Sequence, residues 1–291
     1  MSKRNKPSQD DPAKSDRPAV QVNMNLSRIT KTIFFSCLSI FFLLMFLDYH
    51  VNYAYWTEIG ALRRLCNITR EDGLASYVGV TITGLPALTL WVTYVIERRL
   101  DSKKMARVGW LILALFFSYM AMDDGSSFHE RMGSTFGAIQ DREINSIEGP
   151  TSFAARSLDK FPSYSWQVVY MPIFGVLGAF TFIFLMFQLK TMRRRIAVIC
   201  AFGLMASAIG LDFIEGLDPE HPLNLYTTIT DQYKMNVFTI THFREMAYDA
   251  VQHFSKSIEE VMEMLAMTIL WITFIGHIGS RTSEINVSLN K

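Results

Sequence analysis

The segment Tyr119–Gly133, YMAMDDGSSFHERMG, decides the fold class of this chain. It begins as the end of an apolar run and closes with two aspartates, two serines, a histidine and a glutamate. The apolar run is long enough to cross a membrane, where acidic side chains are costly unless they serve a function. Similar acidic groups stand at the ends of two further apolar runs, in LDFIEG (Leu211–Gly216) and SIEEVMEML (Ser257–Leu265). The sequence therefore predicts a membrane protein with acidic clusters at several helix ends.

The composition favours the same class of protein. Half of the 291 residues are apolar and 19% are charged, whereas about a quarter of the residues in a soluble domain are charged. The apolar residues come in blocks, which is typical of spanning helices. A net charge of +1 disfavours a nucleic-acid partner. Three cysteines, Cys37, Cys66 and Cys200, are too few for a disulfide framework or a thiolate zinc site.

The apolar blocks predict an all-α, polytopic membrane protein: a six-transmembrane-helix bundle with amphipathic helices in its outer loops. Residues 1–28 are polar and predict a disordered cytoplasmic tail, and residues 282–291 predict a second cytoplasmic tail. The transmembrane domain covers residues 29–281. Its predicted spans are residues 32–49, 74–96, 108–130, 168–189, 196–216 and 258–279.

Basic residues predict the orientation of the bundle. They concentrate in the N-terminal tail, in RRLDSKKMAR (Arg98–Arg107), in Lys190–Arg195 and at Arg281. Six spans place all four groups on one side, which the positive-inside rule makes cytoplasmic. We therefore expect a multipass protein of the cell membrane, in a bacterium the inner membrane, with both termini in the cytoplasm and the acidic clusters toward the outer face.

Four acids are predicted at one depth. Each lies 16 to 18 residues from the basic residue at the cytoplasmic end of its span, which is roughly 24–27 Å into a hydrocarbon core of about 30 Å. Several carboxylates in one small volume cannot all be ionised without counter-charge, so either some carry a proton or a cation sits among them. Carboxylates with imidazoles suit a divalent metal ion such as Zn, Mn or Fe. The four acids are Asp48, Asp123, Asp212 and Glu263.

The candidate site residues extend this set. Asp123, Ser126 and Glu130 fall on one stripe of a regular helix and are the candidate catalytic residues. His129 points away from Asp123 on an ideal helix, and a loosened turn at residues 125–127 would bring it back. The competing interpretation is that Arg131, Lys256 and backbone groups satisfy the acids. The candidate metal ligands are Asp48, Asp123, Asp124, His129, Glu130, Asp212, Glu215, His253, Glu259, Glu260 and Glu263.

Three acidic motifs in the chain resemble motifs of a known group of proteins. The chain resembles a family of uncharacterised bacterial six-span membrane proteins, which carry an acidic pair followed by His-Glu after the third span and Glu-Glu-x-x-Glu-Met entering the last. The resemblance covers most of residues 30–280 and implies no established activity. A looser, thematic similarity links the chain to membrane hydrolases of the alkaline ceramidase and adiponectin-receptor type. The chain departs from those hydrolases, because it has six predicted spans and no His-x-x-x-His on the last one. The motifs are Asp123-Asp124…His129-Glu130, Asp212…Glu215 and Glu259-Glu260…Glu263-Met264.

Three classes of function stay open at this point. The first is a metal-dependent hydrolase that acts on a lipid or another membrane-associated substrate, with a carboxylate as general base. The second is a divalent-cation or proton transporter, and the third is a non-catalytic sensor or binding protein. The predicted cytoplasmic halves of the third, fifth and sixth spans contain no acid, Asn or Gln to continue an ion path. The bilayer is the expected partner, and the sequence leaves the oligomeric state open.

Overall fold

The computed structural model describes residues 25–144, 156, 160–243 and 250–281, and every regular element within these ranges is a helix. Six helices are long and apolar enough to cross a membrane. Even the shorter of them, with 23 residues, are about 35 Å long and exceed a hydrocarbon core of about 30 Å. The predicted six-helix, all-α membrane fold is confirmed. The spanning helices are α1 (Leu26–Asp48), continued by a π-helical turn (Tyr49–Tyr53), α3 (Leu74–Arg99), α4 (Lys104–Ser126), α7 (Ser165–Gln188), α8 (Met192–Glu215) and α11 (Ala250–Arg281).

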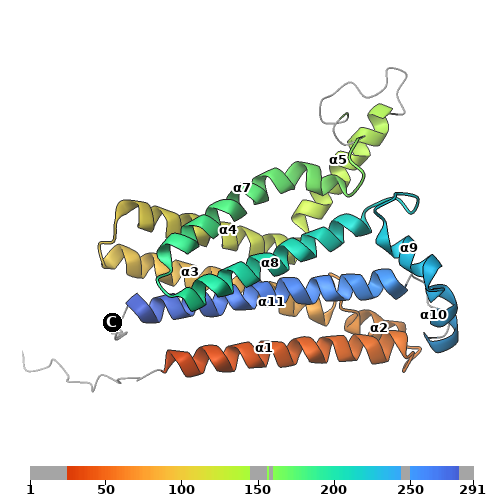
Figure 1. Cartoon of the computed structure of the whole chain (residues 1–291), viewed down its shortest axis with the longest axis horizontal. Helices are drawn as coiled ribbons and strands as arrows, with labels where there is room; N and C mark the ends of the chain where they lie inside the picture. The colour runs from red at the N-terminus through yellow and green to blue at the C-terminus, as the bar shows by residue number, and fades with distance from the viewer. Residues whose placement is uncertain (1–24, 145–155, 157–159, 244–249, 282–291) are drawn as a thin grey trace, which may run out of the picture.

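The last helix lies at the centre of the bundle. α11 packs against α8, α3 and α1, and α3 forms an antiparallel hairpin with α4 (Figure 1). Half of the most apolar stretch of α11 is buried, compared with 11% of that of α7. α7 therefore presents most of its surface outward, as a lipid-facing helix does. The centre of the bundle is thus built mainly by α3, α4, α8 and α11.

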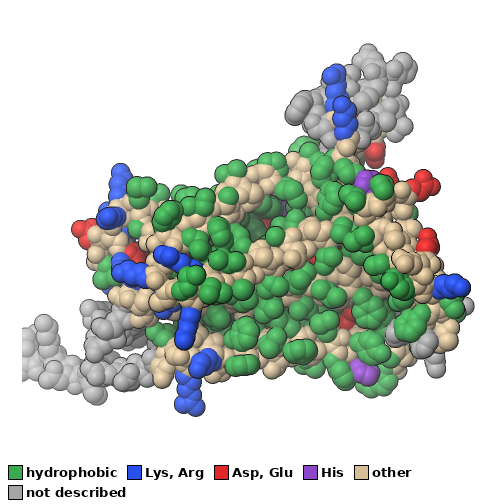
Figure 2. Space-filling view, viewed as in Figure 1, with side chains coloured by type: hydrophobic (Ala, Val, Ile, Leu, Met, Phe, Trp, Pro, Cys, Tyr) green, Lys and Arg blue, Asp and Glu red, His purple; other side chains and the backbone are tan. Residues whose placement is uncertain are grey.

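The two ends of the bundle differ in charge. We call the end that carries Arg98–Arg107, Lys190–Arg195 and Arg281 the basic end, and the opposite end the acidic end. Figure 2 shows lysine and arginine side chains gathered at the basic end. At the acidic end lie α2 (Gly60–Cys66), α5 (Phe128–Ile144), α9 (Leu225–Gln232) and α10 (Met235–Phe243).

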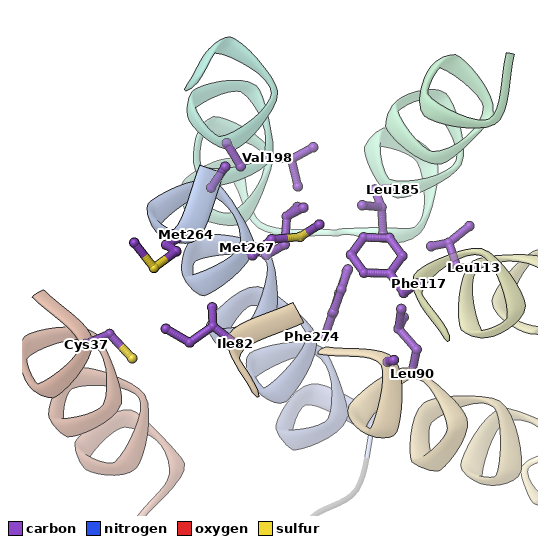
Figure 3. Packing of buried hydrophobic residues seen from close by; sticks show 14 of the residues in the cluster. Cys37, Ile82, Leu90, Leu113, Phe117, Leu185, Val198, Met264, Met267 and Phe274 are labelled. Carbon is purple, nitrogen blue, oxygen red and sulfur yellow. The ribbon is translucent and has the colours of Figure 1, made fainter. Parts of the chain in front are cut away.

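A layer of apolar side chains closes the middle of the bundle. Phe274 of α11 is fully buried, and its ring meets that of Phe117 of α4 edge to face, with 5.5 Å between centroids. Leu90 of α3, Leu113 of α4 and Leu185 of α7 surround these rings (Figure 3). These side chains fill the middle of the bundle between its two ends.

Most helix bounds differ by a few residues from the predicted spans, and two of these differences have a clear local cause. The predicted span 108–130 ends at Ser126, because Ser127 adopts a left-handed backbone conformation (φ 48°) that stops α4 before α5 begins. The predicted span 258–279 starts earlier, at Ala250, since the amphipathic stretch before it continues the same helix. The predicted tails lie almost wholly outside the described residues. Of the first tail, residues 25–28 are described: Asn25 caps α1, and its Oδ1 accepts from the Arg28 N–H at 3.1 Å.

Candidate functional site

A cavity of about 190 Å³ opens at the acidic end between α3, α4, α8, α11 and the first turns of α7. Its wall carries eight acidic side chains, whereas only Arg70, Lys256 and His129 can supply positive charge from the lining residues. The volume is enough for an ion together with several water molecules. We call it the acidic cavity. Its acids are Glu71, Asp123, Asp124, Glu130, Asp212, Glu259, Glu260 and Glu263.

Asp123 and His129 form a pair at the break between α4 and α5. The Asp123 carboxylate accepts the His129 backbone N–H at 2.9 Å and lies 2.6 Å from His129 Nδ1. The left-handed residue Ser127 makes this possible, because it redirects the chain and swings His129 back over the end of α4. The structure therefore contains the loosened turn at residues 125–127 that the sequence offered only as a hypothesis. Burial would lower the pKa of His129, but the bonded Asp123 outweighs it and raises that pKa.

The start of α7 covers the imidazole. Trp166 meets the His129 ring edge to face, with 4.7 Å between centroids. Gly133 allows this approach: a Cβ at that position would stand 2.7 Å from the Trp166 backbone nitrogen. The pair of Asp123 and His129 is thus shielded on one side by an aromatic side chain and faces the cavity on the other.

Two carboxyl groups meet at the mouth of the cavity. Glu130 and Glu71 share a side-chain hydrogen bond, and the Ser127 hydroxyl also donates to Glu71, at 2.5 Å. Burial, followed by the bond to Glu71, raises the pKa of Glu130 to about 7, whereas the bond from Glu130 lowers the pKa of Glu71. Such an arrangement is one proton shared by two carboxyl groups. Glu130 keeps part of its side chain in contact with solvent.

Polar neighbours hold two further acids. Gln167 of α7 donates to Asp212 of α8 at 2.8 Å, and Thr83 of α3 donates to Asp124 of α4 at 3.2 Å. Each bond comes from a different spanning helix, so the acids orient toward the cavity that those helices enclose. Both bonds also leave the carboxylates with oxygens to offer to a ligand.

The α11 wall contains an acid that has no such support. Glu259 is 8% exposed, and its Oε2 is buried without a hydrogen-bond partner among the described residues. Glu260 and Glu263 line the same wall. Because a buried carboxylate oxygen without a partner is costly, Glu259 is the clearest sign that the cavity takes a ligand or a proton.

Three of the predicted metal ligands do not line the cavity. Glu215 is 3.4 Å from Lys256 Nζ and accepts from the Tyr164 hydroxyl at 3.2 Å. Asp48 and His253 pair with each other at 2.8 Å and join α1 to α11. Asn52 adds a bond of 2.7 Å to Asp48.

The hydroxyl group at the cavity is that of Ser127. The Ser126 hydroxyl donates to the Met122 carbonyl at 2.8 Å along its own helix, and Ser126 does not line the cavity.

Glu71 and Gln167 are functional candidates that sequence reasoning missed. Glu71 lies in a polar loop next to Asp72, where nothing in the sequence separates an inward acid from a surface one. Asp72 faces outward and binds Arg64 and Arg70.

The donors suit a hard or borderline cation, but they are spread around the cavity. Among the described residues, no three His, Cys, Asp or Glu side chains converge as a metal ion requires. Binding of a metal ion would therefore need side-chain rotations that bring these donors together. The unpartnered oxygen of Glu259 and the excess of carboxylates over cationic groups are the observations that fit such a ligand.

Comparison with known proteins identifies the family. A family model described as "Domain of unknown function (DUF8692)" matches residues 34–278, which include every residue of the acidic cavity. No curated protein and no solved structure matches the chain. The thematic likeness to alkaline ceramidases and adiponectin receptors is not addressed by these comparisons and stays a prediction. The match covers most of the chain, and the protein therefore belongs to the DUF8692 family.

Proposed function

We propose that the protein is a multipass protein of the bacterial inner membrane that binds a divalent cation in its acidic cavity. The basic end would face the cytoplasm, together with both termini, because lysine and arginine gather there. The acidic cavity would then open toward the outer face of the membrane. The ion would be Zn, Mn or Fe, the divalent ions that carboxylates with an imidazole suit.

The charge balance of the cavity carries this proposal. Eight carboxyl groups face one lysine, one arginine and one histidine, and at least one carboxylate oxygen is buried without a partner. Protonation of the Glu71–Glu130 pair removes one negative charge and leaves most of the excess. A divalent cation between the α4, α8 and α11 walls would neutralise it. The acids on these three walls are Asp123, Asp124, Asp212, Glu259, Glu260 and Glu263.

The finer proposal is that the site hydrolyses a lipid or another membrane-associated substrate. Below the acids, the cavity wall is apolar, as an acyl chain would require. Figure 2 shows a recess in the surface between α7 and α8, where a lipid could enter from the bilayer. The apolar lining residues are Met120, Phe174, Met205, Ile209, Met264 and Met267.

Glu130 is the best-placed general base for that reaction. Its pKa of about 7 lets it take a proton from water and return it at neutral pH. The water oxygen would add to the ester or amide carbon as Glu130 takes a proton, and the same proton would then pass to the leaving oxygen or nitrogen. His129, held by Asp123, would donate a hydrogen bond to the developing negative charge. A bound cation would polarise the water and the bond that breaks.

A proton or cation transporter is the second candidate. The hydrogen bond between Glu71 and Glu130 favours it, since two carboxyl groups that share a proton are typical of proton relays. The apolar side chains packed around Phe117 and Phe274 in the middle of the bundle disfavour it, because they offer no polar group to a passing ion. A sensor would use the same cation site without chemistry.

Elemental analysis of protein purified without chelator tests the cation. We expect a stoichiometric divalent metal in the wild type and in Glu220→Gln, an exposed acid outside the cavity, and its loss in Asp212→Asn. Wild-type protein without metal would contradict the proposal.

Metal-loaded wild type, incubated with membrane lipid extracts and analysed by mass spectrometry, tests the reaction. We expect a product that Glu130→Gln does not form. Metal binding without any product, together with a pH-driven current in proteoliposomes, would favour the transporter.

A further inference from the structure

A second cavity, of about 440 Å³, lies at the basic end. It is enclosed by the loop between α3 and α4, the loop between α7 and α8, and the last turns of α11. We call it the basic-end cavity. It shares no lining residue with the acidic cavity, and the proposed function makes no use of it.

The two acids of this cavity already have partners. Glu97 is 2% exposed and accepts from Arg281 Nε at 2.6 Å and Nη2 at 2.9 Å, with His277 Nε2 at 3.2 Å. Asp101 lies 3.3 Å from Arg107 Nη1. Neither acid is therefore left to neutralise further basic groups in the cavity.

Two lysines line the same cavity from different loops. Lys103 precedes α4 and Lys190 lies between α7 and α8, and both are exposed. Within the described ranges, neither lysine has an acid at ion-pair distance. Three basic and two acidic side chains line the cavity, and both acids already face an arginine, so the wall between the two loops keeps a positive excess.

The backbone adds to this potential. α4 begins at this wall with Ala106 in its first turn, and it has no side-chain cap at its N-terminus. The first turn of α4 thus keeps unsatisfied N–H groups, which carry partial positive charge. The cavity therefore combines two lysine ammonium groups with one helix start, a combination that suits a phosphate.

We propose that the basic-end cavity binds a phosphate group between Lys103 and Lys190. The site stands at the level where the loops of a spanning bundle meet the lipid headgroups, on the face that collects basic residues. The phosphate belongs either to an anionic lipid or to a soluble phosphate ester. The inference is independent of the cation proposed for the acidic cavity.

The experiment uses full-length protein in nanodiscs of phosphatidylcholine, with and without phosphatidic acid, and measures the melting temperature. Phosphatidic acid should raise the melting temperature of the wild type, because a ligand of the folded state stabilises it. Glycerol phosphate, added to phosphatidylcholine nanodiscs, is the soluble arm. An equal rise in that arm identifies a soluble phosphate, and a rise with phosphatidic acid alone identifies a lipid.

Matched variants distinguish binding at this cavity from general attraction of phosphate by surface charge. Lys103→Gln/Lys190→Gln should weaken the apparent affinity for the phosphate by about thirty-fold. Lys104→Gln/Arg193→Gln removes the same charge from neighbouring residues that do not line the cavity, and it should keep the wild-type affinity. Lys103→Arg/Lys190→Arg should restore binding and shows that the positions tolerate substitution. Equal losses in both Gln pairs, or no rise in the wild type in either arm, would overturn the proposal.

Discussion

The two ends of the bundle each bury a glutamate, and the environments of these two residues differ. Glu97 at the basic end is 2% exposed and accepts hydrogen bonds from Arg281, while Ser102 and His277 complete its shell. Glu259 at the acidic end is 8% exposed, and one of its oxygens has no partner among the described residues. A fully satisfied buried acid holds helices together, whereas an unsatisfied one calls for a ligand. The difference separates a structural site from a functional one.

The largest expected effect comes from breaking the satisfied site. Arg281→Gln would leave Glu97 buried without its main counter-charge, and we expect a loss of about 3 kcal/mol in the free energy of unfolding. The matched change Arg193→Gln, at an exposed arginine of the same end, should stay within about 0.5 kcal/mol. Unfolding in a denaturing detergent measures both. Equal losses would mean that Glu97 is not held as described.

The unsatisfied site should respond differently. In the presence of chelator, Glu259→Gln replaces a carboxyl group whose buried oxygen has no hydrogen-bond partner among the described residues, so we expect no loss of stability. With a saturating divalent metal the same variant should be less stable than the wild type, because it has lost a ligand. Melting temperatures measured with chelator and with metal show whether the variant is more or less stable than the wild type. A destabilised variant in chelator would show that Glu259 is structurally satisfied.

The pH dependence of stability sharpens the comparison at the cavity mouth. The pKa of Glu130 is raised from 4.5 to about 7, so the folded state binds a proton that the unfolded state releases between these values. This contribution is complete below about pH 4.5 and is lost as the pH rises through about 7. Glu130→Gln should flatten that part of the pH profile of the melting temperature. An unchanged pH profile of the melting temperature would contradict a proton shared between Glu71 and Glu130.

The smallest expected effect distinguishes two neighbouring serines. Ser127→Ala removes the hydroxyl that donates to Glu71 and should cost about 1 kcal/mol. Ser126→Ala removes a bond to the backbone of its own helix and should change stability by less than about 0.5 kcal/mol. The same unfolding assay compares them. A larger effect at Ser126 would reverse the assignment of the hydroxyl that faces the cavity.

The sequence predicts well how far along its helix each acid lies, but it predicts poorly which way the side chain faces. Counting residues from the basic end predicted one level for the acids, and Asp123, Asp212 and Glu263 do line one cavity. Asp48 was predicted at the same level, but it faces α11 and binds His253. Depth follows from 1.5 Å per residue, whereas the direction of a side chain depends on how each helix is rotated against its neighbours.

The hydrophobic pattern also did not predict where the backbone departs from a regular helix. An ideal helix turns His129 away from Asp123, and the left-handed residue Ser127 brings the two together. Glu71 reaches the cavity through the fold of a loop, which no periodicity describes. Hydrophobic blocks therefore predicted the spans, while the partners of individual acids required three-dimensional contacts.

The most direct test of the central claim is a calorimetric titration of Mn²⁺ or Zn²⁺ into metal-stripped, full-length protein. The cation site predicts saturable binding in the wild type and in Glu220→Gln, and its loss in Glu263→Gln, whose side chain lines the acidic cavity. Binding that is absent in the wild type, or that persists unchanged in Glu263→Gln, would contradict a cation site built from these carboxylates.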